Sequence, residues 1–205
     1  MPSLRVAFLT LAWLGAALSA HAMSVVPPSF DELVAVADNV VRGEVTSVRS
    51  AYVDRPSGRV IRTFVTIHVE RTLKGPAAPT DTLVLSFLGG TVGSDSLEVS
   101  GMPAFHAGDR EIVFVGANGR TFCPLVAAGH GRYHLLHDAA TDRDFVARDN
   151  LTPLESTADI VLPLETAAPG NRLKSAARAL SPGDFETRIV EAVARLSPPA
   201  VKTQN

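Results

Sequence analysis

The sequence predicts a mainly β fold with one short helix before the strands and one amphipathic helix after them. Three observations carry this prediction. Short segments of alternating polar and apolar residues recur between residues 39 and 147, turns containing Gly or Pro separate these segments, and an apolar period of 3.6 residues occurs only near the two ends. Closely spaced strands joined by such turns are typical of β-barrels and β-sandwiches.

The first 22 residues have the pattern of a secretory signal peptide. Arg5 supplies a positive charge, residues 6–18 form an apolar run, and Ala20 and Ala22 frame a cleavage site of the small-x-small type. The apolar run is too short for a membrane span, which needs about 20 residues. We therefore expect cleavage after Ala22, a mature chain without a membrane span, and a periplasmic or secreted location.

The first helix is predicted to begin after Ser29, because Ser29 and Glu32 can form a capping box. Phe30 and Leu33 share one face of this helix, which is expected to end near Ala37. The period then changes to two residues, as in half-buried strands. The predicted strands are residues 41–48, 63–73, 82–88, 96–99, 111–116, 122–127, 133–136 and 144–147.

The second predicted strand shows the clearest alternation. Val65, Ile67 and Val69 fall on one face, whereas His68 and Glu70 fall on the other. Successive side chains of a strand point to opposite faces of its sheet. We therefore expect the three apolar residues in the core and the two polar residues in solvent.

Residues 149–180 have no clear period and are interpreted as a linker. A helix is predicted over residues 181–197, because Ser181 can cap its first turn and Pro182 suits its first position. Its apolar stripe predicts packing on the strands or on a partner, and consists of Phe185, Ile189, Val193 and Leu196. Its polar face is assigned to Glu186, Arg188, Glu191 and Arg195. Residues 198–205 are interpreted as a tail.

The charge balance indicates that nucleic acid is not a partner. The chain has 19 basic and 21 acidic residues, a formal net charge of −2, and only three lysines, which are far apart in the sequence. A surface that binds phosphates requires clustered Lys and Arg. The sequence shows no such cluster.

Cys123 is the single cysteine, so the chain cannot form an internal disulfide. Its neighbours Phe122 and Pro124 are apolar, which favours a buried thiol that acts as a small hydrophobic residue. An intermolecular disulfide and a reactive thiol are the open alternatives.

Two motifs resemble a pattern found in uncharacterised exported bacterial proteins. They are Ala-Asp-Asn-Val-Val-Arg-Gly-Glu-Val at residues 37–45 and Val-Glu-Arg-Thr-Leu-Lys-Gly at residues 69–75. Further matches are residues 89–93, 101–105, 108–109, 112–115 and 129–133. The same motifs are similar to parts of netrin-like and tissue-inhibitor-of-metalloproteinase-like modules. This resemblance implies an OB-like small β-barrel, which we assign to residues 23–148.

The resemblance carries over a fold and not an activity. The inhibitor modules chelate a protease zinc through the amine of an N-terminal cysteine, and they are rich in disulfides. This sequence has one cysteine, in its interior. No inhibitory residue is therefore carried over to this chain.

The histidines are the candidate metal ligands. On a helix, His130, His134 and His137 would share one face, as in zinc enzymes. On a strand, His130 and His134 would share a face and His137 would lie on the other. His106 could join them only through the fold, so His106, His130 and His134 are the candidate ligands of a metal-dependent hydrolase.

Other chemical signatures are weak. The acidic residues Asp95, Glu98, Asp109 and Glu111 are interpreted as surface charges, with a calcium site as the alternative. No cofactor is expected, because the sequence contains no phosphate loop, no zinc-protease motif and no nucleophile elbow.

These observations favour an exported, non-enzymatic binding or accessory module that contacts a protein or an envelope polymer. The alternative is a metal-dependent hydrolase that uses the histidine cluster. The sequence leaves open whether the chain is an enzyme, and favours the reading that it is not.

Overall fold

A computed structural model describes residues 26–56, 58–77, 80–164 and 176–196. The signal peptide predicted at residues 1–22, part of the predicted linker and the tail lie outside the described residues. The elements run in the order α1 (Phe30–Val36), β1 (Asn39–Arg55), β2 (Gly58–Lys74), β3 (Thr82–Leu88), β4 (Gly90–Val92), β5 (Asp95–Leu97), β6 (Arg110–Val115), the 3-10 helix η1 (Ala128–Gly131), β7 (Arg132–Asp138), β8 (Arg143–Arg148), the 3-10 helix η2 (Thr157–Val161) and α3 (Pro182–Leu196).

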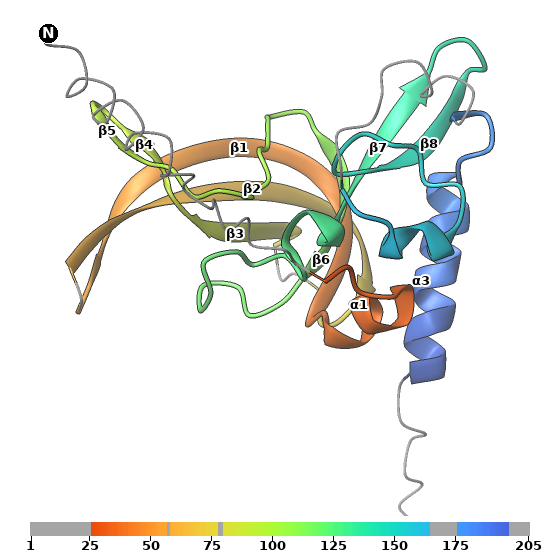
Figure 1. The fold of residues 1–205 in the computed structure, drawn as a ribbon, viewed down its shortest axis with the longest axis horizontal. Coiled ribbons are helices and arrows are strands. Elements are labelled where there is room, and N and C mark those ends of the chain that lie inside the picture. Colours follow the sequence, from red (N-terminus) through yellow and green to blue (C-terminus); the bar gives the residue numbers. More distant parts are fainter. Residues whose placement is uncertain (1–25, 57, 78–79, 165–175, 197–205) are drawn as a thin grey trace, which may run out of the picture.

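The main sheet has six antiparallel strands in the order β3-β2-β1-β6-β7-β8. β1 and β2 have 17 residues each and pair along almost their whole length. Figure 1 shows these two strands arching away from the end of the molecule that carries α1, α3, β7 and β8. We call the projecting part of β1, β2 and β3 the arm. β4 and β5 form a separate two-stranded hairpin.

The prediction of an OB-like barrel is wrong, because the sheet is not closed. Its outer strands are β3 and β8, and each is covered by another part of the chain. At β8, the Val146 N–H donates to the Leu180 carbonyl, and the Val146 carbonyl accepts from the Leu154 N–H. The C-terminal half of β8 is therefore paired with the segment that follows it and not with β3.

The edge of β3 is covered by a side chain. The Asn118 carboxamide accepts a hydrogen bond from the Ser86 N–H and donates one to the Val84 carbonyl. The Leu88 N–H donates to the carbonyl of Phe122, in the same connecting segment. This segment takes the place of a further strand at β3.

The alternation predicted for the second strand is confirmed in β2. Val65, Ile67 and Val69 are buried, whereas His68 and Glu70 are exposed. The first helix is confirmed as well: the Ser29 side chain accepts from the Glu32 N–H, and the Glu32 carboxylate accepts from the Ser29 N–H.

The predicted strand at residues 122–127 is wrong, because this segment forms only an isolated bridge between Leu125 and Val115. Cys123 and Leu125 are buried against the sheet without pairing as a strand. The apolar pattern here reports burial and not strand pairing.

The apolar stripe of the C-terminal helix docks on the chain's own sheet. Phe185 and Ile189 of α3 are fully buried among residues of α1, β6 and β7. The Phe185 ring lies 4.8 Å from that of Tyr133 and 6.4 Å from that of Phe114, measured between ring centroids. Leu196, at the end of the stripe, remains exposed.

The prediction that Glu186 of α3 lies on the polar face of the helix is wrong. Its carboxylate is buried and pairs with Arg42 Nη1 at 2.8 Å and with Arg71 Nη1 at 2.7 Å. These two guanidinium groups come from β1 and β2, so the carboxylate ties the helix to the sheet.

The described part of the predicted linker contributes residues to the core. Leu154 and Ile160 are fully buried in the cluster that contains Phe185. Among the described residues, no helix is long and apolar enough to cross a membrane.

Candidate functional site

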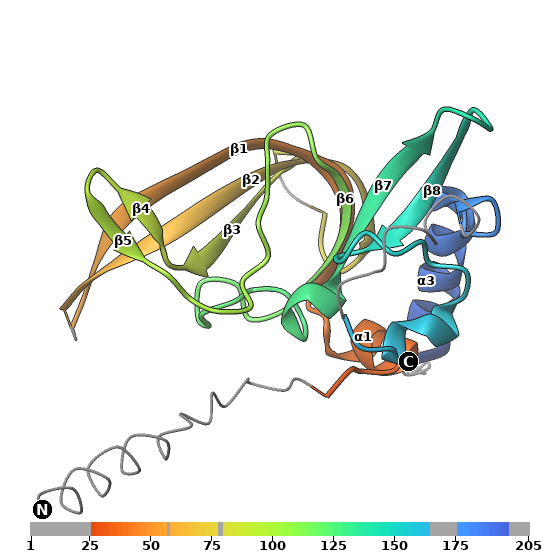
Figure 2. The ribbon, with the colours of Figure 1, turned by 45° about the horizontal axis from the view of Figure 1, so that its top comes forward.

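A cavity of about 540 Å³ lies against the arm. Its floor is the inner face of the arm, which we define as the face that carries Val48, Val65 and Phe87. Its opposite wall is the segment that connects β5 with β6. Figure 2 shows this segment crossing in front of the arm before it enters β6.

The cavity lining combines apolar side chains with hydroxyl groups and one carboxylate, and about half of its exposed surface is apolar. Val65, Phe87 and Phe105 form its buried part, whereas Val48 is 40% exposed and leaves the cavity accessible. The crossing segment contributes Met102, Pro103, Ala104 and Phe105, which we call the wall. The remaining lining residues include Leu97, Val99, Ser50, Thr63, Thr91, Ser96 and Glu98.

Two adjacent glycines shape the mouth of the cavity. Gly89 and Gly90 have φ values of 100° and 124°, which side chains rarely adopt. A Cβ atom on Gly90 would lie 2.3 Å from Ser50 Oγ and from Thr63 Oγ1. Glycine is therefore required where the chain leaves β3 and crosses the arm as β4.

The hydroxyl groups in the lining already have partners. Ser50 Oγ lies 3.0 Å from Thr63 Oγ1, and the Thr63 hydroxyl donates to the Gly89 carbonyl at 2.8 Å. These bonds tie the start of β4 to β1 and β2.

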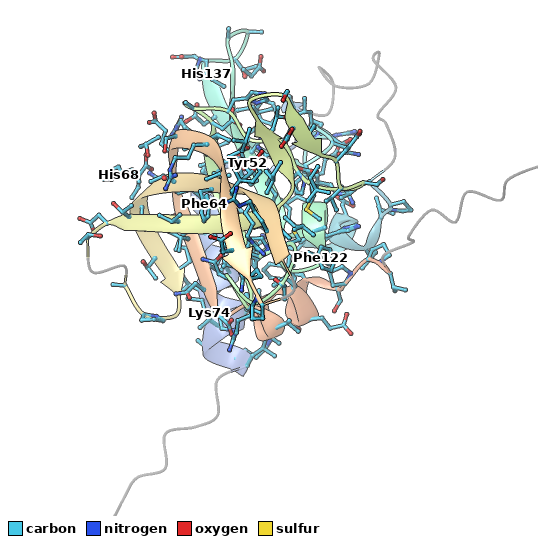
Figure 3. All side chains as sticks on the ribbon, turned by 90° about the vertical axis from the view of Figure 1, so that its left-hand side faces the viewer. Tyr52, Phe64, His68, Lys74, Phe122 and His137 are labelled. Atoms are coloured by element: carbon cyan, nitrogen blue, oxygen red, sulfur yellow. The ribbon has the colours of Figure 1, made fainter. Side chains whose placement is uncertain are left out.

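The β4–β5 hairpin is held to the arm near its tip by Tyr52. The Tyr52 hydroxyl donates to Asp95 Oδ2 at 2.5 Å, and this hydrogen bond raises the pKa of Tyr52. The Arg59 guanidinium lies over the Tyr52 ring, 5.1 Å from its centroid. Figure 3, which views the arm from its tip, shows Tyr52 of β1 and Phe64 of β2.

A buried ion cluster lies behind the wall, centred on Arg132 of β7. Its guanidinium donates to both carboxylate oxygens of Glu111 in β6, at 2.6 and 2.8 Å. It also donates to Asp149 Oδ1 and to Asp109 Oδ2, both at 3.2 Å. Glu111 was interpreted as a surface charge, and this is wrong, because its side chain is fully buried.

The ion cluster touches two residues of the wall directly. Arg132 Nη1 donates to the Ala104 carbonyl at 2.6 Å, and the Arg132 guanidinium lies 3.9 Å from the centroid of the Phe105 ring. The ion cluster and the cavity are therefore parts of one structural unit.

Burial and charge act in opposite directions within the ion cluster. Burial lowers the pKa of Arg132, but hydrogen bonding and attraction by Glu111, together with attraction by Asp149 and Asp109, raise it overall. Burial raises the pKa of the Asp149 carboxyl in spite of the attraction by Arg132.

The candidate histidine ligands lie in three different environments. His106 is exposed in the turn before β6, with Nδ1 3.7 Å from Asp109 Oδ2. His134 lies in β7, with Nδ1 3.3 Å from Glu111 Oε1. His130 is buried in η1, and its Nδ1 has no hydrogen-bond partner among the described residues.

No group of three or more His, Cys, Asp or Glu side chains in the described part of the chain is arranged to hold a metal ion. His68 and His137 lie well apart on the surface, as Figure 3 shows. His137 Nδ1 instead lies 2.9 Å from Asp144 Oδ1 in the neighbouring strand.

Cys123 is buried as a free thiol in the same apolar cluster as Leu125 and Phe105. Burial raises the pKa of this thiol. A raised pKa reduces the thiolate fraction and with it the nucleophilicity of the sulfur.

Neither the cavity nor the ion cluster was predicted. The Gly89-Gly90 pair and the Asp109-x-Glu111 pattern were visible signals, but the partner Arg132 is more than twenty residues away in the sequence. Only the antiparallel pairing of β6 with β7 brings it to Glu111.

A comparison with known proteins found no matching family model and no curated protein with significant similarity to the chain. The resemblance to netrin-like and tissue-inhibitor-of-metalloproteinase-like modules therefore stays a prediction.

Proposed function

We propose that this chain is an exported, non-enzymatic binding module that takes an apolar group of a partner protein into the cavity of the arm. The observation that carries the proposal is an open cavity of about 540 Å³ whose buried part is formed by the apolar side chains of Val65, Phe87 and Phe105. Binding sites for small ligands are commonly of about 300–1,000 Å³ and largely apolar, with a few polar groups.

The chemistry of the lining supports binding and not catalysis. Nucleophilic catalysis needs a base within hydrogen-bond reach of the nucleophile. The described lining residues include neither His nor Cys. Their hydroxyls pair with one another, Ser50 with Thr63 and Thr91 with Ser96, and among the described residues none of these hydroxyls is bonded to the Glu98 carboxylate. No observation favours the alternative of a metal-dependent hydrolase, which stoichiometric metal in the purified protein would support.

The charge of the lining restricts the occupant. Glu98 is the single ionisable side chain among the described lining residues, so an anionic ligand would meet repulsion. A polysaccharide would need many polar partners, whereas the lining hydroxyls already pair with one another, Ser50 with Thr63 and Thr91 with Ser96. An apolar side chain on a protein segment without acidic neighbours fits both conditions.

The test uses N-phenyl-1-naphthylamine, an uncharged apolar probe that fluoresces on leaving water. Val48 and Val84 are matched sites, because they are 40% and 45% exposed on β1 and β3 of the arm, and only Val48 lines the cavity. Val48→Asp is expected to weaken probe binding by about tenfold or more, which corresponds to roughly 1.4 kcal/mol. Val84→Asp should leave binding within about twofold. No binding by the unmodified protein, or equal loss in the two variants, would contradict the proposal.

The class of partner is tested by selecting peptides from a displayed random library against the protein. We expect enrichment of peptides with a large apolar residue and no acidic neighbour, and these peptides should displace the probe. Selected peptides that bind without displacing the probe would contradict the assignment of the cavity to a protein partner.

A further inference from the structure

The wall of the cavity is formed by irregular backbone. Residues 98–109 contain no helix or strand, yet four of them, Met102 to Phe105, form one side of the cavity. The end of this segment is fixed to β1, because the Gly108 N–H donates to the Val45 carbonyl and the Asp109 carbonyl accepts from the Val45 N–H. The wall itself needs another anchor.

Arg132 is placed to be that anchor. It donates to the Ala104 carbonyl at 2.6 Å and lies over the Phe105 ring at 3.9 Å, so it holds two consecutive residues of the wall. The Phe105 ring in turn packs against Phe87 on the cavity floor, with the centroids 5.3 Å apart.

The guanidinium is itself held by regular structure. Arg132 begins β7, and the two hydrogen bonds to Glu111 join it to β6. Two parallel hydrogen bonds between a guanidinium and a carboxylate fix the orientation of the guanidinium plane as well as its position. The orientation matters because the same group must face both a carbonyl oxygen and an aromatic ring.

We infer that Arg132 is the positioning residue of the cavity, which sets the wall at Ala104 and Phe105 at its distance from the floor. The role in ligand binding rests on the proposed function, whereas the anchoring of the wall does not. Lysine keeps the charge but lacks the planar fork, so it cannot make the Glu111, Ala104 and Phe105 contacts together.

The test compares Arg132→Lys with Arg62→Lys. Arg62 is a matched control, because it too is buried and donates to three acceptors, Ser86 Oγ, the Ser86 carbonyl and the Thr121 carbonyl. It contacts the segment that covers β3 and does not line the cavity. Hydrogen exchange detected by mass spectrometry reports local opening of each segment.

Arg132→Lys is expected to speed exchange by about tenfold at the hydrogen-bonded amides of residues 102–109, which include those of Met102 and His106, while α3 keeps its protection. It should also weaken binding of N-phenyl-1-naphthylamine by about tenfold. Arg62→Lys should speed exchange near residues 117–123 and leave both the wall and probe binding unchanged. Unchanged exchange in the wall of Arg132→Lys would overturn the inference.

A second variant covers the case in which Arg132→Lys does not fold. Arg132→Met with Glu111→Met removes the two most deeply buried charges of the ion cluster together, a change that proteins often tolerate. The remaining carboxylates, Asp109 and Asp149, have side chains that are 27% and 23% exposed, so they keep contact with solvent. The double variant should show the same faster exchange in the wall. A wall as protected as in the unmodified protein would overturn the inference.

The two readouts separate this inference from the proposed function. Faster exchange in the wall, with no probe binding even by the unmodified protein, supports the anchoring role and contradicts the proposed function. Faster exchange with undiminished probe binding overturns the claim that Arg132 positions the cavity.

Discussion

Phe185 joins both helices to the sheet, and its truncation gives the largest stability change that we expect. Its side chain is fully buried, and its ring packs against those of Phe30, Phe114 and Tyr133. Phe185→Ala should lower the free energy of unfolding by about 3–5 kcal/mol, the range for a buried Phe that leaves a cavity. For a domain of this size, that corresponds to roughly 6–20 °C in melting temperature.

The assay is urea denaturation of the chain that begins at Met23, with unfolding monitored by far-ultraviolet circular dichroism. Val190→Ala is the matched control, because Val190 lies on the same helix and is 43% exposed. It should change the free energy of unfolding by less than about 0.5 kcal/mol, as exposed sites usually do. Equally small effects of the two substitutions would refute the docking of α3 on the sheet.

Three further predictions test other parts of the structure. Ile67→Ala should lower the free energy of unfolding by about 2–5 kcal/mol, because Ile67 is fully buried in β2. His68→Ala should be near neutral, and thermal melts of the two variants that show equal effects would contradict the register of β2. Gly90→Ala should displace β4, because its Cβ would lie 2.3 Å from two hydroxyl oxygens, and unchanged amide NMR signals of Ser50 and Thr63 would refute this. Burial lowers the pKa of His130, so the unfolded state binds the proton more readily and stability should fall as the pH drops below about 6.5. His130→Gln should reduce this loss of stability in denaturation measured at several pH values. An unchanged loss in this variant would contradict the prediction.

Local sequence patterns were sufficient for elements whose packing depends on one face. The alternation of Val65, Ile67 and Val69 identified the buried face of β2, and the capping box at Ser29 identified the start of α1. In both cases the signal lies within a few residues, because the period of a strand or helix is a local property.

The closure of the sheet could not be predicted in this way, since it depends on residues far apart in sequence. β8 is covered through Leu180, and β3 is covered by the Asn118 side chain. Glu186 looks like a surface residue on a helical projection, yet its partners Arg42 and Arg71 lie more than 100 positions earlier. Periodicity therefore predicted both helices and most strands, although not the absence of a strand at residues 122–127, and it predicted neither the order of the strands nor the ion pairs.

The same limit applies to the candidate site. The sequence directed attention to His106, His130 and His134, whereas the structure brings together a wall around Phe105, a floor at Val48 and Phe87, and Arg132 behind the wall. A cavity is made by the approach of distant segments, so no single stretch of sequence carries its pattern.

The most direct test of the proposed binding site is an NMR titration of the labelled protein with N-phenyl-1-naphthylamine. We expect saturable shifts in the amide signals of Val48, Thr63, Phe87 and the wall residues Met102 and Phe105, all of which line the cavity. Signals of α3 and of Val84 should not move. Shifts centred on α3 or on the outer face of the arm, or no saturable shift at all, would contradict the claim that the cavity of the arm is the binding site.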